Sequence, residues 1–388
     1  MPNEKLVKAK KAKFDEFYTL YDDIQYEVNA YLEYNPDVFK NKTILLPCDD
    51  PEWSNFTRFF AQNFERFGLK KLISTSFAFE SKKDKWYQLT MFEELSPKFD
   101  KLKTKSHGKI FTLTKDKNNS KKIDINDLEW NYLKGDGDFR SDEVKKLRDE
   151  ADIIVTNPPF SLFSEFLNWI LEANKQFLII GNKSVVGWRD IFPLFKDNKI
   201  WSGKTEWSGG LWFETKHPYD IDKIINGINM KNVPSAWFTN IEHGRRHTPI
   251  NLMTMSENLK FSKHKDIRKN GYKKYDNFDA IEVNYYDAIP SDYNGIMGVA
   301  ITFLDKYCPE QFEIIALGNS RENFMPNKDY INPKKIMKDG SIHNGGAINC
   351  VLAIETDEKP TDQIYYISDN SKYLIAPYTR ILIRRKKS

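Results

Sequence analysis

The chain has 388 residues, enough for roughly two to three domains with a large buried core. Its 59 basic and 55 acidic side chains leave a formal net charge of +4, which permits basic local faces and hence nucleic-acid binding. No stretch is apolar enough to cross a membrane, and Met1–Lys13 lacks the apolar run of a secretion signal. The composition thus argues against a membrane protein, and we expect a cytoplasmic location.

The cysteines and histidines form no disulfide or metal pattern. Cys48, Cys308 and Cys350 lie far apart with no C-x-x-C pair, so neither a disulfide framework nor a structural zinc site is indicated. His243 and His247 lie close together, but the adjacent arginines would repel a cation and no carboxylate pattern supports a metal. We therefore expect no metal.

An aromatic segment follows the lysine-rich start of the chain. Phe17 and Tyr18 could cover an adenosine ring, and Thr19 is predicted to cap a helix over Tyr21–Tyr34. The lysines of Lys5–Lys13 are more simply explained as a solvated arm. The aromatic pair is the first candidate contact to a nucleoside.

A strand predicted over Thr43–Pro47 ends in two acidic residues. Asp49 and Asp50 follow Cys48 directly, and an aromatic-rich helix is predicted over Ser54–Phe67. Carboxylates at a strand end can bind the ribose hydroxyls or the ammonium group of a cofactor, or one of them can simply cap the next helix. The spacing leaves both alternatives open. No glycine lies in this region, so its backbone cannot approach a cofactor as a glycine-rich loop does.

Two segments then precede the central motif. A strand is predicted over Leu69–Ser76, and residues 77–124 are predicted as an inserted surface hairpin with a strand-like centre at Lys109–Leu113. In the glycine–aspartate loop that follows, Asp138 and Phe139 could hydrogen-bond an adenine amino edge and stack on the ring. A solvent-exposed turn is the alternative.

The central motif is a strand that stops abruptly. Ala151–Thr156 has the composition of a strand buried on both faces. The tetrapeptide Asn157–Phe160 (Asn-Pro-Pro-Phe) cannot continue it, because proline has no N–H to donate and fixes its own φ. The amphipathic pattern beyond predicts a helix with Ser161 as its cap. The tetrapeptide is therefore expected at the carboxyl end of a strand, where open α/β sheets bind ligands.

The chemistry of this tetrapeptide suits a planar heterocycle with an amino group. Asn157 offers an amide oxygen, the prolines leave backbone carbonyls without a strand partner, and Phe160 offers a flat apolar face. Adenine presents such an amino group and such a face. The alternative is a strand-ending turn with Phe160 in the core.

A basic segment follows two further predicted strands, over Gln176–Gly181 and Val233–Thr239. Its Arg245, Arg246 and His247 are candidates for contact with phosphates. An exposed charged loop explains the segment equally well.

From about Leu252 the alternation of strands and helices disappears, and we expect a second domain to begin near residue 245. This region contains the lysine-rich stretch Lys263–Lys274 and closes with a strand predicted over Tyr378–Ile383. Its length and its basic stretch favour a duplex nucleic acid as the partner.

Together these motifs resemble those of the EcoRI-type adenine-specific DNA methyltransferases. The resembling segments are Asp15–Thr19, Cys48–Pro51, Gly135–Ser141, Thr156–Phe163, Ile296–Leu304 and Arg380–Ile383. The resemblance implies an α/β fold, with a Rossmann-like methyltransferase sheet in residues 1–244 and a mixed α/β target-recognition region in residues 245–388.

The resemblance also implies a reaction. A methyl group would pass from S-adenosylmethionine to the exocyclic amino group of an adenine flipped out of double-stranded DNA, without a metal. The catalytic residues would be Asn157, Pro158, Pro159 and Phe160. The cofactor contacts would be Phe17, Tyr18, Thr19, Pro47, Cys48, Asp49, Asp50, Asp138, Phe139 and Asn157. The DNA contacts would be Arg245, Arg246, His247, Lys263, Lys265, Lys273 and Lys274.

The biological setting follows from the same resemblance. We expect a monomer that acts on nucleoid DNA. It would serve either in a restriction-modification system, with a cognate restriction endonuclease as a functional rather than a physical partner, or as an orphan or phage-encoded methylase. Two alternatives stay open at this point. One is a DNA-binding module whose methyltransferase fold has decayed, as the strand end without glycine suggests. The other is an amino-methyltransferase that acts on RNA, cytosine or protein glutamine.

Overall fold

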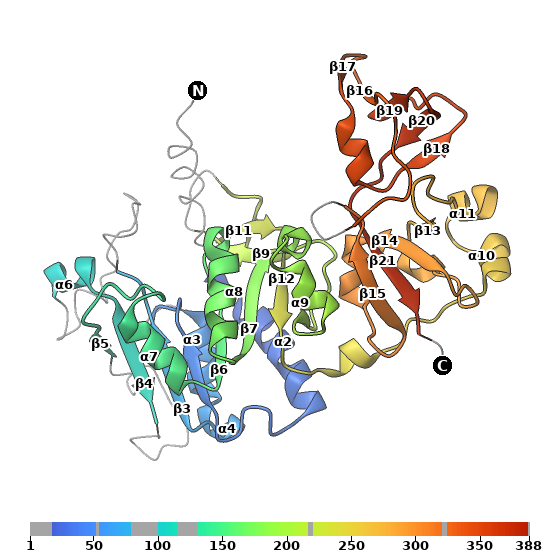
Figure 1. Cartoon of the computed structure of the whole chain (residues 1–388). Coiled ribbons are helices and arrows are strands. Elements are labelled where there is room, and N and C mark those ends of the chain that lie inside the picture. Colours follow the sequence, from blue (N-terminus) through green and yellow to red (C-terminus); the bar gives the residue numbers. More distant parts are fainter. Residues whose placement is uncertain are drawn as a thin grey trace. The chain divides into compact units, whose positions relative to one another are not determined.

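The computed structural model describes residues 18–51, 54–78, 100–114, 130–215, 220–319 and 324–386 (Figure 1). The chain divides into two compact units. The first comprises the chain as far as Lys183 together with Ser202–Gly244, and the second comprises Ser184–Trp201 together with the chain from Arg245 onward. Ser184–Trp201 thus belongs to the second unit although it lies within the first 244 residues.

The first unit is built on a mixed sheet of eight strands in the order β5-β4-β3-β2-β6-β7-β12-β8. These strands are β2 (Thr43–Leu46), β3 (Lys71–Thr75), β4 (Lys109–Leu113), β5 (Trp130–Tyr132), β6 (Ile153–Thr156), β7 (Gln176–Asn182), β8 (Trp201–Ser202) and β12 (Ser235–Thr239). The central strands β3, β2, β6 and β7 pair in parallel, whereas β4, β5 and β12 join by antiparallel pairing. The predicted α/β class is confirmed, and the sheet is mixed rather than wholly parallel.

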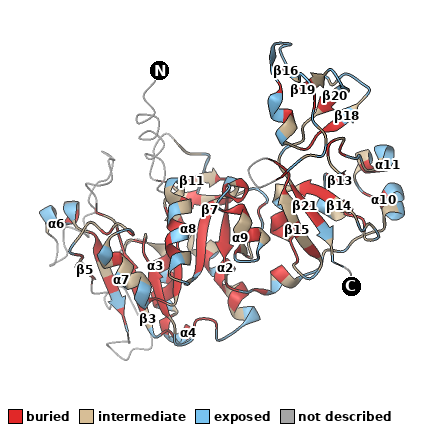
Figure 2. Ribbon diagram, viewed as in Figure 1, coloured by how far each residue is buried: buried red, intermediate tan, exposed pale blue. Residues whose placement is uncertain are grey.

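The central strands form because their residues are apolar and often β-branched, which suits a sheet that is buried on both faces. All residues of β2 and β6 are buried. The neighbouring strand β7 is drawn mostly in the red of buried residues (Figure 2). The strand predicted over Thr43–Pro47 ends at Leu46, because Pro47 has no N–H for the ladder. The other predicted strands of this sheet lie where expected and differ only at their ends.

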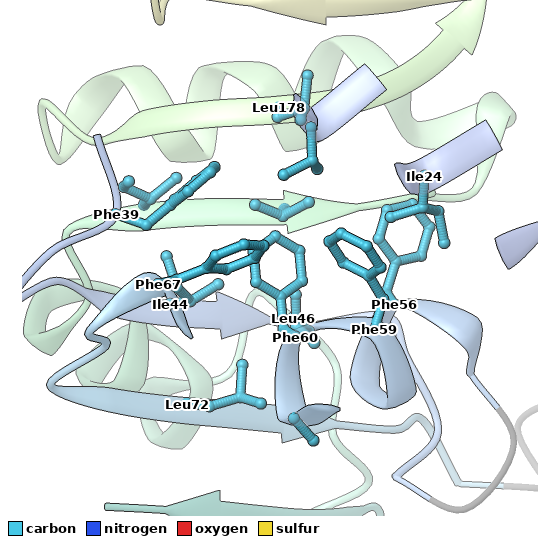
Figure 3. Close-up of a cluster of buried hydrophobic side chains, with 14 of the residues drawn as sticks. Ile24, Phe39, Ile44, Leu46, Phe56, Phe59, Phe60, Phe67, Leu72 and Leu178 are labelled. Carbon is cyan, nitrogen blue, oxygen red and sulfur yellow. The ribbon is translucent and has the colours of Figure 1, made fainter. Parts of the chain in front are cut away.

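Helices cover both faces of this sheet. They are α2 (Tyr21–Tyr34), α3 (Asn55–Gln62), α4 (Phe64–Phe67), α7 (Asp142–Glu150) and α8 (Phe163–Glu172). Side chains of α2, α3 and α4 share one core with Ile44, Leu46 and Leu178 (Figure 3). The opposite face of β7 contacts α8, because the ring of Phe163 fills the space that a side chain at Gly181 would need.

Phenylalanines make the aromatic centre of this core. The ring centroids of Phe59 and Phe60 lie 5.4 Å apart, and those of Phe39 and Phe67 lie 5.5 Å apart. Each such pair adds roughly 0.5–1.5 kcal/mol to the gain from burial. The helix predicted over Ser54–Phe67 breaks at Asn63, which ends α3 and precedes α4. Aromatic packing therefore holds both pieces on the sheet despite the break.

The predicted insertion over residues 77–124 is described only in part. Its predicted strand Lys109–Leu113 is present as β4, which pairs with β3 and β5, so this strand extends the large sheet. The helix α6 (Lys101–Ser106) precedes β4, with Asp100 as its N-cap. Residues 79–99 and 115–129 lie outside the described part.

A smaller sheet completes the first unit, in the order β1-β9-β11-β10. Its strands are β1 (Tyr18–Thr19), β9 (Leu211–Glu214), β10 (Lys223–Ile225) and β11 (Ile228–Val233). Tyr18 pairs with Glu214, and Thr19 pairs with Phe213. This pairing ties the start of the described chain into the unit before α2 begins.

The second unit contains two further sheets, in the orders β13-β14-β21-β15 and β17-β16-β19-β20-β18. The first consists of β13 (Ala280–Val283), β14 (Ile296–Ala300), β15 (Phe312–Leu317) and β21 (Arg380–Arg385). The second consists of β16 (Lys334–Ile336), β17 (Ile342–Asn344), β18 (Ile354–Thr356), β19 (Tyr365–Ser368) and β20 (Ser371–Ile375). The helices of this unit are α9 (Phe192–Lys196), α10 (Met255–Phe261) and α11 (Lys265–Asn270), and α9 packs against β15.

A buried ion pair joins the strands of the first of these sheets. Arg380, which begins β21, donates to Oε1 of Glu282 from Nε at 2.8 Å and from Nη2 at 2.6 Å. Tyr275 donates its hydroxyl to the other oxygen of Glu282. The strand predicted over Tyr378–Ile383 is present as β21, which begins at Arg380 and ends at Arg385.

Gly137, in the loop between β5 and α7, allows a close approach of backbone segments. Its φ is +84°, and a Cβ at this position would lie 2.1 Å from the carbonyl oxygen of Ser76. Next to it, the Ala78 amide donates to the Asp136 carbonyl at 2.7 Å. The glycine therefore lets this loop cross the end of β3.

Replacing Gly137 by alanine should lower the free energy of unfolding by more than about 2 kcal/mol, because a backbone clash adds to a left-handed penalty of roughly 1–2 kcal/mol. Gly227→Ala is the matched control, since Gly227 has a φ of +81° and nothing within 4 Å of the added Cβ. Urea unfolding followed by circular dichroism measures both variants. Equal losses would contradict the importance of the contact with Ser76.

Candidate active site

The carboxyl ends of β2 and β6 form a topological switch point in the large sheet. From β2 the chain continues to β3 on one side, and it later returns on the other side of β2 as β6. Because these strands are parallel, the segments that follow them emerge at the same edge of the sheet. These segments are Cys48–Asp50 and Asn157–Phe160, so two of the predicted site segments lie together.

The tetrapeptide leaves β6 in an extended conformation. Pro159 has a φ of −56° and a ψ of 122°, and the short 3₁₀ helix η4 (Phe160–Leu162) follows. Pro158 is buried, whereas Asn157 and Phe160 are partly exposed. Phe160 also packs against the main core, so its ring has a structural contact and an accessible part at once.

The helix after the tetrapeptide begins later than predicted. η4 intervenes, and α8 starts at Phe163 with Leu162 as its N-cap and no side-chain cap bond. The prediction that Ser161 caps this helix is therefore wrong, because Ser161 lies inside η4.

The Asp49 carboxylate connects the two strand ends. Its Oδ2 accepts a hydrogen bond from Thr156 Oγ1 at 2.6 Å, and its Oδ1 accepts one from Ser54 Oγ at 2.6 Å. Its backbone amide donates to the carbonyl of Thr75 at 3.0 Å. Asp49 thus joins the end of β6, the start of α3 and the end of β3.

Burial dominates the electrostatics of this carboxylate. Asp49 is only 6% exposed. Desolvation raises its pKa from 3.8 to about 7, the negative charge of Asp50 adds to the rise, and the hydrogen bonds from Ser54 and Thr156 oppose it. The group therefore titrates near neutral pH.

Asp50 lies in a different environment from its neighbour. Its side chain is 28% exposed, and its Oδ2 lies 3.7 Å from the Nζ atom of Lys109. That lysine is buried and stands over the ring of Trp130, with Nζ 5.1 Å from the ring centroid. Asp50 is therefore the more accessible carboxylate of the pair.

Neither carboxylate caps the helix that follows. The N-cap of α3 is Ser54, whose side chain accepts a hydrogen bond from the Phe56 amide at 3.1 Å. The capping alternative for Asp49 and Asp50 is thus wrong. Asp49 acts on the helix start indirectly, since it accepts the hydrogen of the capping hydroxyl.

The aromatic segment adjoins the same helix start. The carbonyl oxygen of Thr19 accepts a hydrogen bond from Asn55 Nδ2 at 2.9 Å. α2 runs over Tyr21–Tyr34 as predicted, but its N-cap is Leu20 with no side-chain cap bond, so the predicted capping role of Thr19 is wrong. Phe17, the other predicted cofactor contact of this segment, lies outside the described residues.

The predicted adenine contacts of the glycine–aspartate loop have other partners. Phe139 is buried, and its ring packs edge-on against Phe166 and Trp169 with centroids 5.1 and 5.7 Å away. Asp138 forms an ion pair with Arg140 at 2.5 Å, and this hydrogen-bonded pair lowers the pKa of Asp138. These positions favour structural roles, and stacking on adenine would require the Phe139 ring to be uncovered.

The basic segment of the second unit is held by internal contacts. Arg245 Nη2 lies 2.7 Å from Asp305 Oδ1. Arg246 is buried, stands 3.6 Å from the centroid of the Trp201 ring, and donates to Asn198. These contacts favour structural roles for both arginines over contact with phosphates.

The other predicted DNA contacts are more accessible. His247 lies 2.8 Å from Glu310 Oε1 and is partly exposed. Lys263 is exposed and forms an ion pair with Asp287 at 2.7 Å. The remaining candidates, Lys265, Lys273 and Lys274, are exposed.

Metal ligands do not cluster in the described residues, where no group of three or more His, Cys, Asp or Glu side chains is arranged to hold an ion. His243 is buried, and its Nε2 lies 2.9 Å from the carbonyl oxygen of Ser202. Within the same residues, no helix combines the length and apolar character needed to cross a membrane.

Thr156, Ser54 and Asn55, whose polar groups connect the predicted segments, are not among the predicted site residues. Thr156 is the last residue of a buried strand, where a hydroxyl needs a partner. The Thr156 hydroxyl, at the end of an apolar strand, needs a hydrogen-bond partner, and the acidic end of the neighbouring strand offers one. This need is the signal in the sequence that could have revealed the connection.

Comparisons with known proteins agree on one family. The family model of the adenine-specific methyltransferase EcoRI matches residues 5–386. The type II methyltransferase M.EcoRI of Escherichia coli is 40% identical over 320 residues, which cover 81% of this chain and 89% of that protein. M.MgeORF184P of Mycoplasma genitalium is 38% identical over 316 residues, and M.MpnI of Mycoplasma pneumoniae is 37% identical over 315, each covering 79% of this chain and 84% of the relative. No solved structure matches the chain.

The raised pKa of Asp49 should make stability depend on pH. Its value of about 7 in the folded chain exceeds the ordinary 3.8, so between these values the folded chain binds a proton that the unfolded chain releases. The free energy of unfolding should therefore fall by up to about 1.4 kcal/mol per unit as the pH rises toward about 7, and then level off. Asp49→Asn should lack this component. Urea unfolding between about pH 5 and 8 tests this, and equal slopes in both proteins would contradict it.

Proposed function

The chain belongs to the EcoRI family of adenine-specific methyltransferases, and from this premise we propose that it methylates the exocyclic amino group of adenine in duplex DNA, with S-adenosylmethionine as the donor. The observation that carries the proposal is the position of Asn157–Phe160 at the carboxyl end of β6, beside the acidic end of β2. A strand end at a switch point is where α/β folds bind nucleotide-like ligands. The parallel centre of the sheet supports a Rossmann-like reading of this unit.

The donor set at this edge fits S-adenosylmethionine. The cofactor has an ammonium group and a sulfonium centre, and Asp50 offers a partly exposed carboxylate. Tyr18 and Cys48, both partly buried, offer further contacts, with Pro47 at the end of β2. When bound, the cofactor supplies an electrophilic methyl group. These residues would hold it without the glycine-rich loop that many nucleotide-binding folds use.

The target adenine must leave the duplex, because its amino nitrogen cannot reach a methyl donor while it is stacked and paired. In the proposed complex, the Asn157 side chain and the Pro158 carbonyl accept the two amino hydrogens. Phe160 stacks on the ring, and Pro159 keeps the segment extended. Base–aromatic stacking contributes roughly 1–3 kcal/mol, which offsets part of the cost of flipping.

Catalysis on this proposal is mainly a matter of position. Two acceptors on the amino group turn the nitrogen lone pair toward the methyl group, and they stabilise the positive charge that develops on nitrogen. The reaction then needs no covalent intermediate on the protein. The cofactor sulfur would leave as a neutral thioether, and the methylated nitrogen would lose its extra proton to solvent.

The second unit is proposed as the target-recognition region. Lys263, Lys265, Lys273 and Lys274 would contact phosphates, and their exposure supports this role. Arg245 and Arg246 would not, because they have partners within the second unit. The protein would act as a monomer on nucleoid DNA. A cognate endonuclease would act on the same target sequence without binding the methyltransferase.

Asn157→Ala tests the proposed chemistry most directly. It removes one of two acceptors, so turnover should fall at least about a hundredfold, as expected when one preorganised transition-state hydrogen bond is lost. Folding and cofactor affinity should change little, because the strand and both prolines remain. The measurement is transfer of a tritiated methyl group from S-adenosylmethionine to duplex DNA.

Asn168→Ala is the matched control, because Asn168 is exposed on α8. It should leave turnover and the thermal melting temperature unchanged. Near-normal transfer by a folded Asn157→Ala protein would overturn the catalytic role. A wild-type protein that bound DNA but not S-adenosylmethionine would instead be a decayed DNA-binding module.

Neutralising Lys273 or Lys274 separates phosphate contact from base reading. Either change to alanine should weaken binding to cognate and random duplexes by a similar factor, and should reduce the slope of log affinity against log salt by about 0.9. Fluorescence anisotropy across a salt series measures both quantities. A variant that changed the preferred sequence would identify the lysine as a base reader.

A further inference from the structure

A buried carboxylate stands directly behind the proposed catalytic segment. We propose that Asp49 is a positioning residue, which fixes the Asn157 acceptor through the hydroxyl of Thr156, and that it does not contact the cofactor or the base. This inference rests on the proposed function. It separates the roles of Asp49 and Asp50, which are adjacent in sequence.

The path from Asp49 to Asn157 is short. Thr156 is fully buried, and its Oγ1 donates to Asp49 Oδ2 at 2.6 Å. A β-branched side chain has few rotamers, so a strong hydrogen bond on its hydroxyl also restrains the backbone that carries it. Asn157 is the next residue, so a restraint on that backbone also restrains the point from which its side chain extends.

The carboxylate is itself held from several directions. Its second oxygen accepts the Ser54 hydroxyl at 2.6 Å, and its backbone amide donates to Thr75 at 3.0 Å. Its backbone carbonyl accepts the Ser74 hydroxyl at 2.6 Å. These contacts come from β3 and from the start of α3. Asp49 is therefore fixed relative to both elements, and its bond to Thr156 fixes the end of β6 relative to them as well.

The environment of Asp49 argues against a role as a cofactor ligand. Both oxygens face hydroxyls inside the unit, and the residue is 6% exposed, whereas the Asp50 side chain is 28% exposed. The charge of Asp50 acts on Asp49, and Lys109 pairs with Asp50 rather than with Asp49. A carboxylate buried beside another carboxylate is unfavourable for stability, so a positioning role explains Asp49 better than a contribution to folding does.

The test uses Thr156→Val, which keeps the shape and removes the hydroxyl, and Thr156→Ser, which keeps the hydroxyl. Single-turnover methyl transfer should slow about tenfold to a hundredfold in Thr156→Val, since small misplacements of a reacting group have effects of this size. Thr156→Ser should stay within about threefold of the wild type. Affinity for S-adenosylmethionine, measured by calorimetry, should be unchanged in both.

Asp49→Asn provides an independent readout. Its transfer rate should fall as in Thr156→Val, and the double variant should be no slower than the slower single variant, because both changes break one connection. The wild-type rate should decline below about pH 7, where a proton on Asp49 forces one hydroxyl to turn, and the rate of Asp49→Asn should not follow this titration. Asp50→Asn should instead weaken cofactor affinity.

Thr239→Val is the matched control, because Thr239 is also buried in the sheet and its hydroxyl donates to the Phe177 carbonyl at 2.6 Å. It should reduce stability and leave the transfer rate unchanged. Loss of cofactor affinity in Asp49→Asn, or an unchanged transfer rate in folded Thr156→Val, would overturn the inference. If Asn157→Ala retained activity as well, the proposed function itself would fail.

Discussion

The parallel pairing of β2 with β6 is the constraint on which the first unit depends. Ile44 lies opposite Ile153, and Leu45 lies opposite Ile154, so the two chains emerge side by side at one edge of the sheet. A slip of one residue would turn Thr156 to the opposite face of the sheet and break its bond with Asp49. Every residue of both strands is buried, so this register is held by packing on both faces of the sheet, and it brings the acidic segment beside the Asn-Pro-Pro-Phe segment.

Stability and positioning oppose each other at this edge. The central strands gain free energy by burying apolar side chains, whereas Asp49 loses solvation in the same environment. Two hydroxyl hydrogen bonds recover part of the loss, and Asp50 adds repulsion. A local departure from the rule that charges stay outside is typical of functional sites, where the surrounding fold supplies the stability that the site lacks.

The sequence was informative where a segment's own pattern decides its structure. The apolar runs predicted β2, β6 and β7, and the amphipathic pattern after the tetrapeptide predicted the helix α8. The helix predicted over Tyr21–Tyr34 is present with those bounds as α2. Prediction failed for contacts that depend on distant residues. Thr156 and Asp49 are 107 positions apart, and the partners of Arg245 and Arg246 are equally invisible in the local sequence. Thr19 and Ser161 have typical capping chemistry, but a β pairing and a 3₁₀ turn take their positions.

The second unit is discontinuous in sequence. Its segment Ser184–Trp201 carries α9, which packs against β15, and Gly187 lies against Ile301. A fragment that began at residue 245 would lose the helix that covers β15, and a fragment that ended at residue 244 would carry α9 without its support. Recombination between relatives at a single junction would therefore mix the two units. To exchange the whole second unit between two relatives, both of its segments would have to be replaced together.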